Sequence, residues 1–226
     1  MMLPDYWLHR PAMNVDDPAR AAFDQLLARA KFSGTNPLIE YTLPQPRWQF
    51  LCYVADQHAI ALHGTGDANI QLFEPRQPID LSTFGNQKAV YAAGDGLWAM
   101  FFAIVDRDRF RMSVSNACIR LVDPAGQVSD PRYVFSISQA LLPQRPWRKG
   151  YVYLLPSETF VTQPALSFGP YEVRIPQLAS LVAVRPIARL EVAPEDFPFL
   201  ADIRGHDDAR LPEYGQAMQA GAPWPD

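Results

Sequence analysis

The sequence predicts a single α+β domain, with helices mainly in its first half and strands mainly in its second half. The chain has 226 residues, of which 22 are proline, so it favours many turns and short elements over long helices. Helical spacing of apolar residues is clearest before residue 60, whereas short apolar runs bounded by turn residues dominate after residue 110. With 48% hydrophobic residues, the chain is long enough to bury a substantial core.

Helical signals open the chain. Residues 1–17 are expected to be irregular, and Asp17-Pro18 is expected to start a helix, with the aspartate as N-cap and the proline in the first turn. Apolar residues recur at helical spacing between positions 23 and 30, and Gly34 follows the pattern. After the Pro44-Gln45-Pro46 break, a second helix is predicted over residues 47–55.

Short strands and one apolar helix are predicted next. The expected strands cover residues 59–63, 70–73 and 88–92, separated by a turn at 64–69 and a polar loop at 75–87. Gly94-Asp95 then caps a helix that runs to about Val105. Because this helix is apolar nearly all round, we expect it at the centre of the domain.

The second half is predicted to be rich in strands. These cover residues 110–122, 132–141, 150–155 and 181–192, and a short helix is expected over 194–203. The segment from Gly205 is rich in Gly, Pro and Asp and is expected to be an irregular tail. No linker or repeat divides the chain, so residues 1–45, 46–204 and 205–226 are taken as an N-terminal segment, a core and a tail of one domain.

Composition narrows the functional classes. The net charge of −4 argues against a broad nucleic-acid-binding face, although a local basic patch around Arg148 stays open. Cys52 and Cys118 have no metal-ligand spacing and are expected to be buried, reduced thiols, with a disulfide as the open alternative. The sequence shows no secretion signal and no membrane-length apolar run. We therefore expect a cytoplasmic protein with no bound metal and no membrane contact.

Two short segments carry the clearest functional signal. Leu62-His63-Gly64-Thr65 ends one predicted strand, and Ala89-Val90-Tyr91-Ala92-Ala93 ends another directly before the apolar helix. His63 has the chemistry to bond a ribose hydroxyl, Gly64 leaves its backbone amide and carbonyl accessible to a flat amide, and Tyr91 offers a stacking face. Each segment alone is more often structural. Their order along the chain favours a binding slot for a nicotinamide ring.

With these two segments and the aromatic helix that follows them, the chain resembles the ADP-ribosyltransferase superfamily. The similarity is to the His–Tyr–Glu branch, which includes diphtheria-like toxins and poly(ADP-ribose) polymerases, and especially to its small bacterial members; it covers about residues 47–200. The resemblance implies a split, mixed β-sandwich with flanking helices and NAD in its cleft. It further implies that His63 holds the adenosine-side ribose, that the backbone of Gly64 and Thr65 lines the nicotinamide site, and that Tyr91 stacks on the nicotinamide ring.

The third position of the signature departs from the family. The family places a glutamate on a later strand, where its charge stabilises the oxocarbenium-like transition state. Here the positional match is Gln177, with Glu158 and Glu172 as alternatives that are somewhat better explained as solvated carboxylates. Arg76 is a candidate for contacting the pyrophosphate, because its guanidinium has forked donors, and a surface ion pair explains it equally well.

The resemblance implies a glycosyltransferase that uses NAD as substrate. It would break the nicotinamide–ribose bond and pass ADP-ribose to an acceptor, a protein being favoured over a nucleic acid, or to water. The first alternative is an inactive module of the same fold that binds NAD or ADP-ribose, which the glutamine at position 177 favours. An RNA 2′-phosphotransferase relative is a more distant alternative. His58 and His63 are expected on opposite faces of one strand, where they cannot share a metal.

Overall fold

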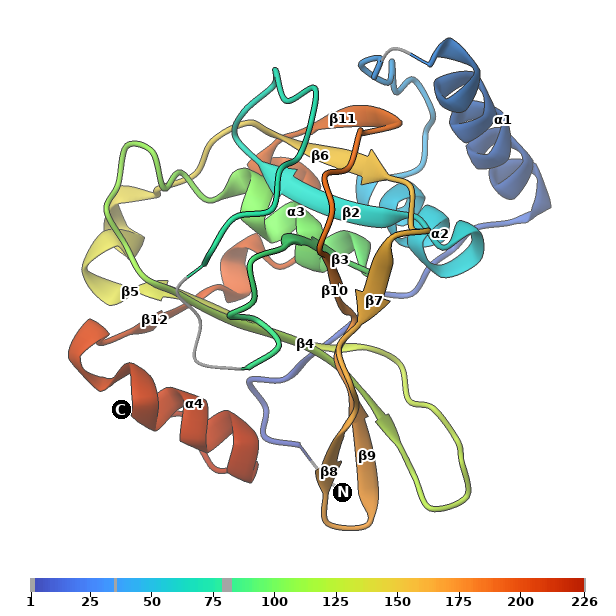
Figure 1. Cartoon of the computed structure of the whole chain (residues 1–226). Helices are drawn as coiled ribbons and strands as arrows, with labels where there is room; N and C mark the ends of the chain where they lie inside the picture. Colours follow the sequence, from blue (N-terminus) through green and yellow to red (C-terminus); the bar gives the residue numbers. More distant parts are fainter. Residues whose placement is uncertain (1–2, 35, 79–82, 226) are drawn as a thin grey trace.

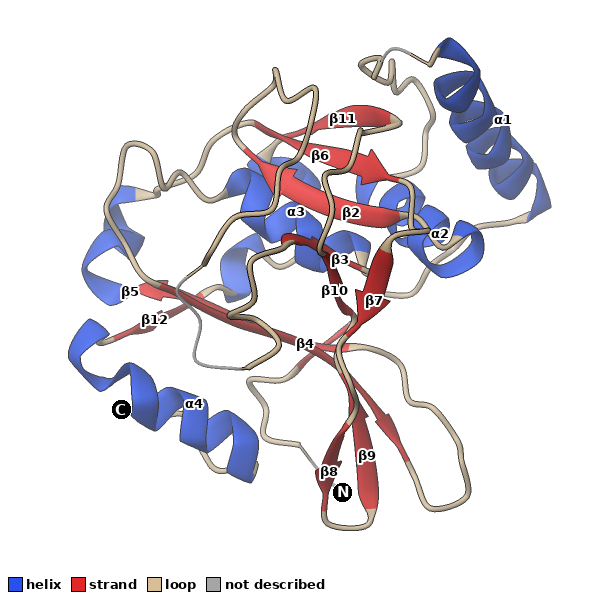
Figure 2. Ribbon diagram, in the orientation of Figure 1, coloured by secondary structure: helices blue, strands red, loops and turns tan. Residues whose placement is uncertain are grey.

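Two six-stranded sheets with a helix between them form the centre of the molecule (Figure 1). The computed structural model describes residues 3–34, 36–78 and 83–225, so residues 79–82 of the predicted polar loop lie outside the described part. The helices are α1 (Asp17–Ser33), α2 (Arg47–His58), α3 (Gly96–Ile104) and α4 (Leu211–Ala220). This arrangement confirms the predicted α+β class (Figure 2).

The first sheet contains the strands β1 (Leu8–His9), β4 (Val114–Val122), β5 (Arg132–Ser138), β8 (Leu166–Phe168), β9 (Tyr171–Arg174) and β12 (Arg204–His206). Its order is β1-β5-β4-β9-β8, and β12 pairs with β5 in parallel. The second sheet contains β2 (Ala61–Thr65), β3 (Val90–Ala93), β6 (Gly150–Leu155), β7 (Phe160–Thr162), β10 (Gln177–Ser180) and β11 (Ala188–Val192). Its order is β11-β6-β2-β3-β10-β7, and all its ladders are antiparallel.

Helix α3 occupies the space between the sheets, as its apolar sequence predicts. Two glycines let its backbone approach the second sheet, because a Cβ at Gly64 would lie 1.8 Å from the carbonyl oxygen of Ala99 and a Cβ at Gly150 would lie 2.0 Å from that of Ala103. On the other side, the ring of Phe101 contacts that of Phe135 in β5 at 4.8 Å between centroids. The helix therefore joins both sheets into one hydrophobic core.

The buried Asp95 starts α3 and links it to two other parts of the chain. One carboxylate oxygen caps the helix by accepting from the amide of Trp98 at 2.9 Å. The other accepts from the Tyr133 hydroxyl at 2.8 Å and forms an ion pair with Arg10 at 2.5 Å. Arg10 also pairs with Asp56 in α2, so the N-terminal segment is held against the core.

Several predicted boundaries in the first half are corrected. Asp16, not Asp17, caps α1 through the amide of Ala19. Helix α2 continues to His58, which therefore lies on a helix and not on a strand with His63. Strand β2 continues through Thr65, so no turn begins at Gly64. The predicted strand at 70–73 is wrong: only Phe73 forms an isolated bridge, to Val184.

The second half differs more from the expectation. β4 begins only at Val114, and the predicted strand at 132–141 ends at Ser138, where a 3₁₀ segment over Gln139–Gln144 begins. Only the last part of the predicted strand at 181–192 is extended, as β11, and β7 to β10 were not predicted. Residues 194–203 form two 3₁₀ turns, Pro194–Asp196 and Leu200–Asp202, because the proline at position 198 interrupts a longer helix.

The prediction of an irregular tail from Gly205 is wrong. Residues in β12 extend the first sheet, and α4 buries Tyr214 and Ala217. The Tyr6 hydroxyl lies 2.8 Å from the Ala222 carbonyl oxygen, and its ring contacts Trp224 at 5.3 Å between centroids. The last helix is thus held against the N-terminal segment. Within the described ranges, no helix is long and apolar enough to cross a bilayer.

Candidate functional site

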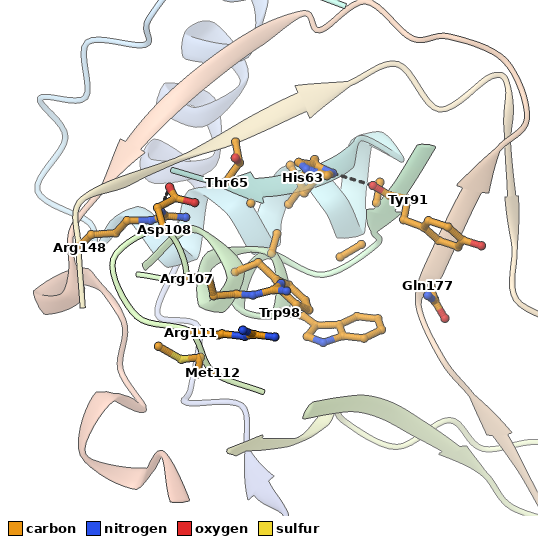
Figure 3. A pocket seen from close by; sticks show the side chains of 16 residues that line it. His63, Thr65, Tyr91, Trp98, Arg107, Asp108, Arg111, Met112, Arg148 and Gln177 are labelled. Carbon is orange, nitrogen blue, oxygen red and sulfur yellow. Dashed lines mark hydrogen bonds and ion pairs between the residues drawn. The ribbon is translucent and has the colours of Figure 1, made fainter. Parts of the chain in front are cut away.

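A pocket of about 610 Å³ opens where β2 and β3 separate (Figure 3). The two strands pair only at Leu62 and Ala93, whereas β2 continues to pair with β6 through Thr65. The edge of β2 at Gly64 and Thr65 therefore faces the pocket instead of a neighbouring strand. A volume of this size is within the range of small-molecule sites.

Five of the predicted site residues line this one pocket. They are His63, Gly64 and Thr65 on β2, Tyr91 on β3 and Gln177 on β10. β10 reaches the pocket because it pairs with β3 in a register that places Gln177 opposite Ala93. Residues distant in the sequence thus meet at one end of the second sheet.

His63 is a neutral, oriented ring. Its Nδ1 lies 2.7 Å from the backbone carbonyl oxygen of Tyr91, and since a carbonyl only accepts, Nδ1 carries the proton. Burial lowers the pKa of His63 below its usual range, and the positive charge of Arg76 lowers it further. The ring also contacts Phe73 at 4.7 Å between centroids. Nε2 of the neutral ring is consequently an acceptor, suited to a hydroxyl that donates.

The packing of α3 against β2 explains why position 64 is a glycine. The space next to its Cα is filled by the backbone of α3, with the carbonyl oxygen of Ala99 1.8 Å from any added Cβ. The absent side chain thus serves the contact between α3 and β2, and only the strand edge remains open to a ligand. Thr65, which is half-buried, uses its hydroxyl to accept from the amide of Asp67 at 3.2 Å.

The hydroxyl group of Tyr91 is held by hydrogen bonds to the backbone. Its hydroxyl donates to the carbonyl oxygen of Phe84 at 2.8 Å and accepts from the amide of Gln87 at 2.9 Å. These bonds fix the ring in one orientation while leaving it half-buried at the pocket wall. Gln177 lies on the same side of the pocket (Figure 3). Its neutral amide offers hydrogen bonds but no negative charge.

Three other candidates do not line the pocket. Glu158 is exposed in the loop between β6 and β7. Glu172 lies on β9 in the first sheet, where it is paired with Arg174 at 2.5 Å. Arg76 forms a backbone bridge with Ala89, and its positive charge lowers the pKa of His63. Of the three candidates for the third position of the signature, Gln177 lines the pocket and the two glutamates do not.

Sequence reasoning missed the opposite wall of the pocket. Trp98 and Phe102 belong to the hydrophobic core, as the apolar helix predicts, but they also line the pocket, and the Trp98 indole donates to the Asn116 side chain at 2.5 Å. The charged wall was also missed; it consists of Arg107, Asp108, Arg111 and Arg148. The signal that could have indicated it is the run Asp-Arg-Asp-Arg-Phe-Arg over residues 106–111, directly after an apolar helix.

Arg148 is neutralised within this wall. It pairs with Asp108 and lies 3.7 Å from the buried carboxylate of Asp106, and its Nε donates to the carbonyl oxygen of Ala103 at 3.3 Å. The sequence left open a local basic patch around this residue. Its position against the end of α3 instead makes it part of the pocket wall.

Other reactive groups lie elsewhere. Cys52 and Cys118 are buried and unbonded to each other, and burial raises the pKa of both thiols. In the described part of the chain, no three His, Cys, Asp or Glu side chains are grouped so that they could hold a metal ion. No protein-family model, curated protein or solved structure matches this chain.

Proposed function

We propose that this chain cleaves the nicotinamide–ribose bond of NAD and transfers ADP-ribose to an acceptor or to water. The observation that carries the proposal is the convergence of His63, Tyr91 and Gln177 on one pocket, at the point where β2 and β3 separate. In this proposal, the three residues take the positions of the His–Tyr–Glu signature. The proposed fold is accordingly the split β-sandwich of the ADP-ribosyltransferases.

Each residue has a defined task in this proposal. The open edge of β2 at Gly64 offers backbone groups to the carboxamide, and the anchored ring of Tyr91 offers a face to the nicotinamide. His63 accepts a hydrogen bond from a ribose hydroxyl through Nε2. The ribose C1′–nitrogen bond then breaks, and nicotinamide leaves with the electron pair. The acceptor attacks C1′ and loses its proton to solvent.

Replacement of Tyr91 by alanine should reduce nicotinamide release from NAD about 10- to 100-fold, because stacking on an aromatic ring contributes about 1–3 kcal/mol. Tyr91→Phe should keep most of the activity, since it keeps the ring and removes the hydroxyl that contacts Phe84 and Gln87. Tyr151→Ala is the control, because Tyr151 is half-buried in the same sheet and does not line the pocket. Release is measured by chromatography of the purified protein with NAD.

The outcomes separate two functions. Release that depends on Tyr91 supports the transferase or glycohydrolase. Thermal stabilisation by NAD without release supports the alternative of a binding module, which the neutral Gln177 favours. If NAD gives neither release nor stabilisation, the proposal is wrong.

Gln177→Glu should increase nicotinamide release at least about 10-fold, since a carboxylate would stabilise the positive charge that develops on the ribose, and single electrostatic groups of this kind contribute about 10²-fold or more. Gln144→Glu makes the same charge change at an exposed position outside the pocket and should have no effect. Rates are compared at saturating NAD. An unchanged or lower rate in Gln177→Glu would exclude position 177 as the third position of the signature.

A further inference from the structure

We infer that Arg107 and Arg111 form a subsite that holds the diphosphate of the ligand and sets the specificity of the pocket for diphosphate-bearing nucleotides. The inference rests on the proposed function for the location of the ligand, but it can be tested separately. Both guanidinium groups extend side by side into the pocket from the segment after α3, next to Trp98 (Figure 3). They were not among the residues predicted from the sequence.

Among the residues that the structure describes, these two arginines have no counterion. Of the charged side chains that line it, Asp108 is paired with Arg148, which also lies near Asp106. Neither the guanidinium of Arg107 nor that of Arg111 contacts a carboxylate of the residues that the structure describes. Two positive charges that are unpaired within the described ranges therefore face one cavity, on a chain whose net charge is −4.

The segment that carries the two arginines is held in place by Asp106. This residue is buried, and its amide donates to the carbonyl oxygen of Pro146 at 2.9 Å. Its side chain accepts from the amide of Arg109 at 3.2 Å, and its carbonyl accepts from the amide of Phe110 at 3.2 Å. The resulting turn directs Arg107 and Arg111 into the pocket and leaves the side chain of Arg109 77% exposed.

A diphosphate diester matches this arrangement in charge and in donor chemistry. It carries one negative charge on each phosphate, and guanidinium groups bind phosphate oxygens through two parallel hydrogen bonds. Nicotinamide and nicotinamide riboside lack these phosphates. The pocket should therefore discriminate against them and retain ADP and ADP-ribose.

The diphosphate is unchanged when the nicotinamide–ribose bond breaks. The two arginines consequently bind the ground state and the transition state equally, so their loss should raise KM and leave kcat nearly unchanged. The product ADP-ribose keeps the same contacts, whereas nicotinamide loses its connection to them. Nicotinamide should therefore leave first, and ADP-ribose should inhibit competitively with NAD.

The test measures binding of ADP-ribose and of inorganic pyrophosphate to the full chain by calorimetry at low ionic strength. Arg107→Gln and Arg111→Gln should each weaken ADP-ribose binding about 10-fold or more, since charge-assisted hydrogen bonds contribute about 1.5–3 kcal/mol. Arg109→Gln is the matched control, because Arg109 lies in the same turn and does not line the pocket. The double variant should also show a weaker dependence of affinity on salt.

The results distinguish this inference from the proposed function. Arginine-dependent binding of ADP-ribose without nicotinamide release would support the subsite and contradict the proposed reaction. Nicotinamide release with the same KM in Arg107→Gln, Arg111→Gln and Arg109→Gln would overturn the subsite and leave the reaction standing. Failure of the wild-type chain to bind either ADP-ribose or pyrophosphate would also overturn it. Thermal melting shows whether each variant is folded, which is expected because both arginines are exposed.

Discussion

Asp95→Ala should lower the free energy of unfolding by about 3–5 kcal/mol, because it leaves a buried cation without one partner of its ion pair. The side chain of Asp95 is 2% exposed and takes part in three interactions, with Trp98, Tyr133 and Arg10. Its replacement also removes the N-cap of α3, the helix that separates the sheets and forms one wall of the pocket.

Thermal unfolding provides the measurement, and the melting temperature should fall by about 10 °C, given about 2–4 °C for each kcal/mol in a chain of this size. Asp16→Ala is the matched control: Asp16 caps α1 in the same way but is exposed and accepts only from the amide of Ala19. Loss of such a cap costs about 1 kcal/mol. Equal effects of the two substitutions would mean that the contacts to Arg10 and Tyr133 contribute nothing to stability.

Gly64→Ala should lower the free energy of unfolding by about 3 kcal/mol or more, the upper end of the range for an overpacked core. The added methyl group would lie 1.8 Å from the carbonyl oxygen of Ala99 and 2.8 Å from the amide nitrogen of Ala103, both in the backbone of α3. The helix and β2 would have to move apart. Since both line the pocket, the proposed binding of NAD and ADP-ribose should weaken together with stability.

The control for this substitution is Gly215→Ala. A Cβ at Gly215 in α4 meets nothing within 4 Å, and alanine favours a helix over glycine by about 1 kcal/mol. Denaturant titration should show that Gly215→Ala is neutral or stabilising and Gly64→Ala strongly destabilising. A Gly64→Ala protein of normal stability would show that α3 tolerates displacement from β2.

The elements that the sequence predicted well are those whose signals are local. The apolar run after Asp95 and the short apolar segments ending at His63 and Leu155 indicate α3, β2 and β6 without knowledge of their partners. Helix α4 also carries local signals, a proline in its first turn and Gly221 after its end. The segment from Gly205 is rich in Gly, Pro and Asp, and this composition led to the prediction of an irregular tail in place of α4.

What could not be predicted depends on contacts between distant segments. Strand β10 is short, and it is extended because its edges pair with β3 and β7. The glycine at position 64 was interpreted as an opening for a ligand, whereas its need arises from α3, a later element. Likewise, the directions of Arg107 and Arg111 follow from a turn that Asp106 anchors to Pro146. Arginines in a sequence can indicate that a chain has the chemistry to bind phosphate, but the fold determines which of them point into a pocket.

The contacts of the N-terminal segment bear on the order in which this chain can fold during synthesis. Arg10 is paired with Asp95 and bonded to Tyr133, and Tyr6 is bonded to the carbonyl oxygen of Ala222. A ribosome makes the residues of this segment among the first of those described here and their last partners among the final ones. Arg10 can pair with Asp56 early, but its contacts with Asp95 and Tyr133, and the bond from Tyr6 to Ala222, must wait until those later residues have emerged. Because closing such long loops costs entropy before any contact repays it, the docking of this segment should be a late and slow step of folding.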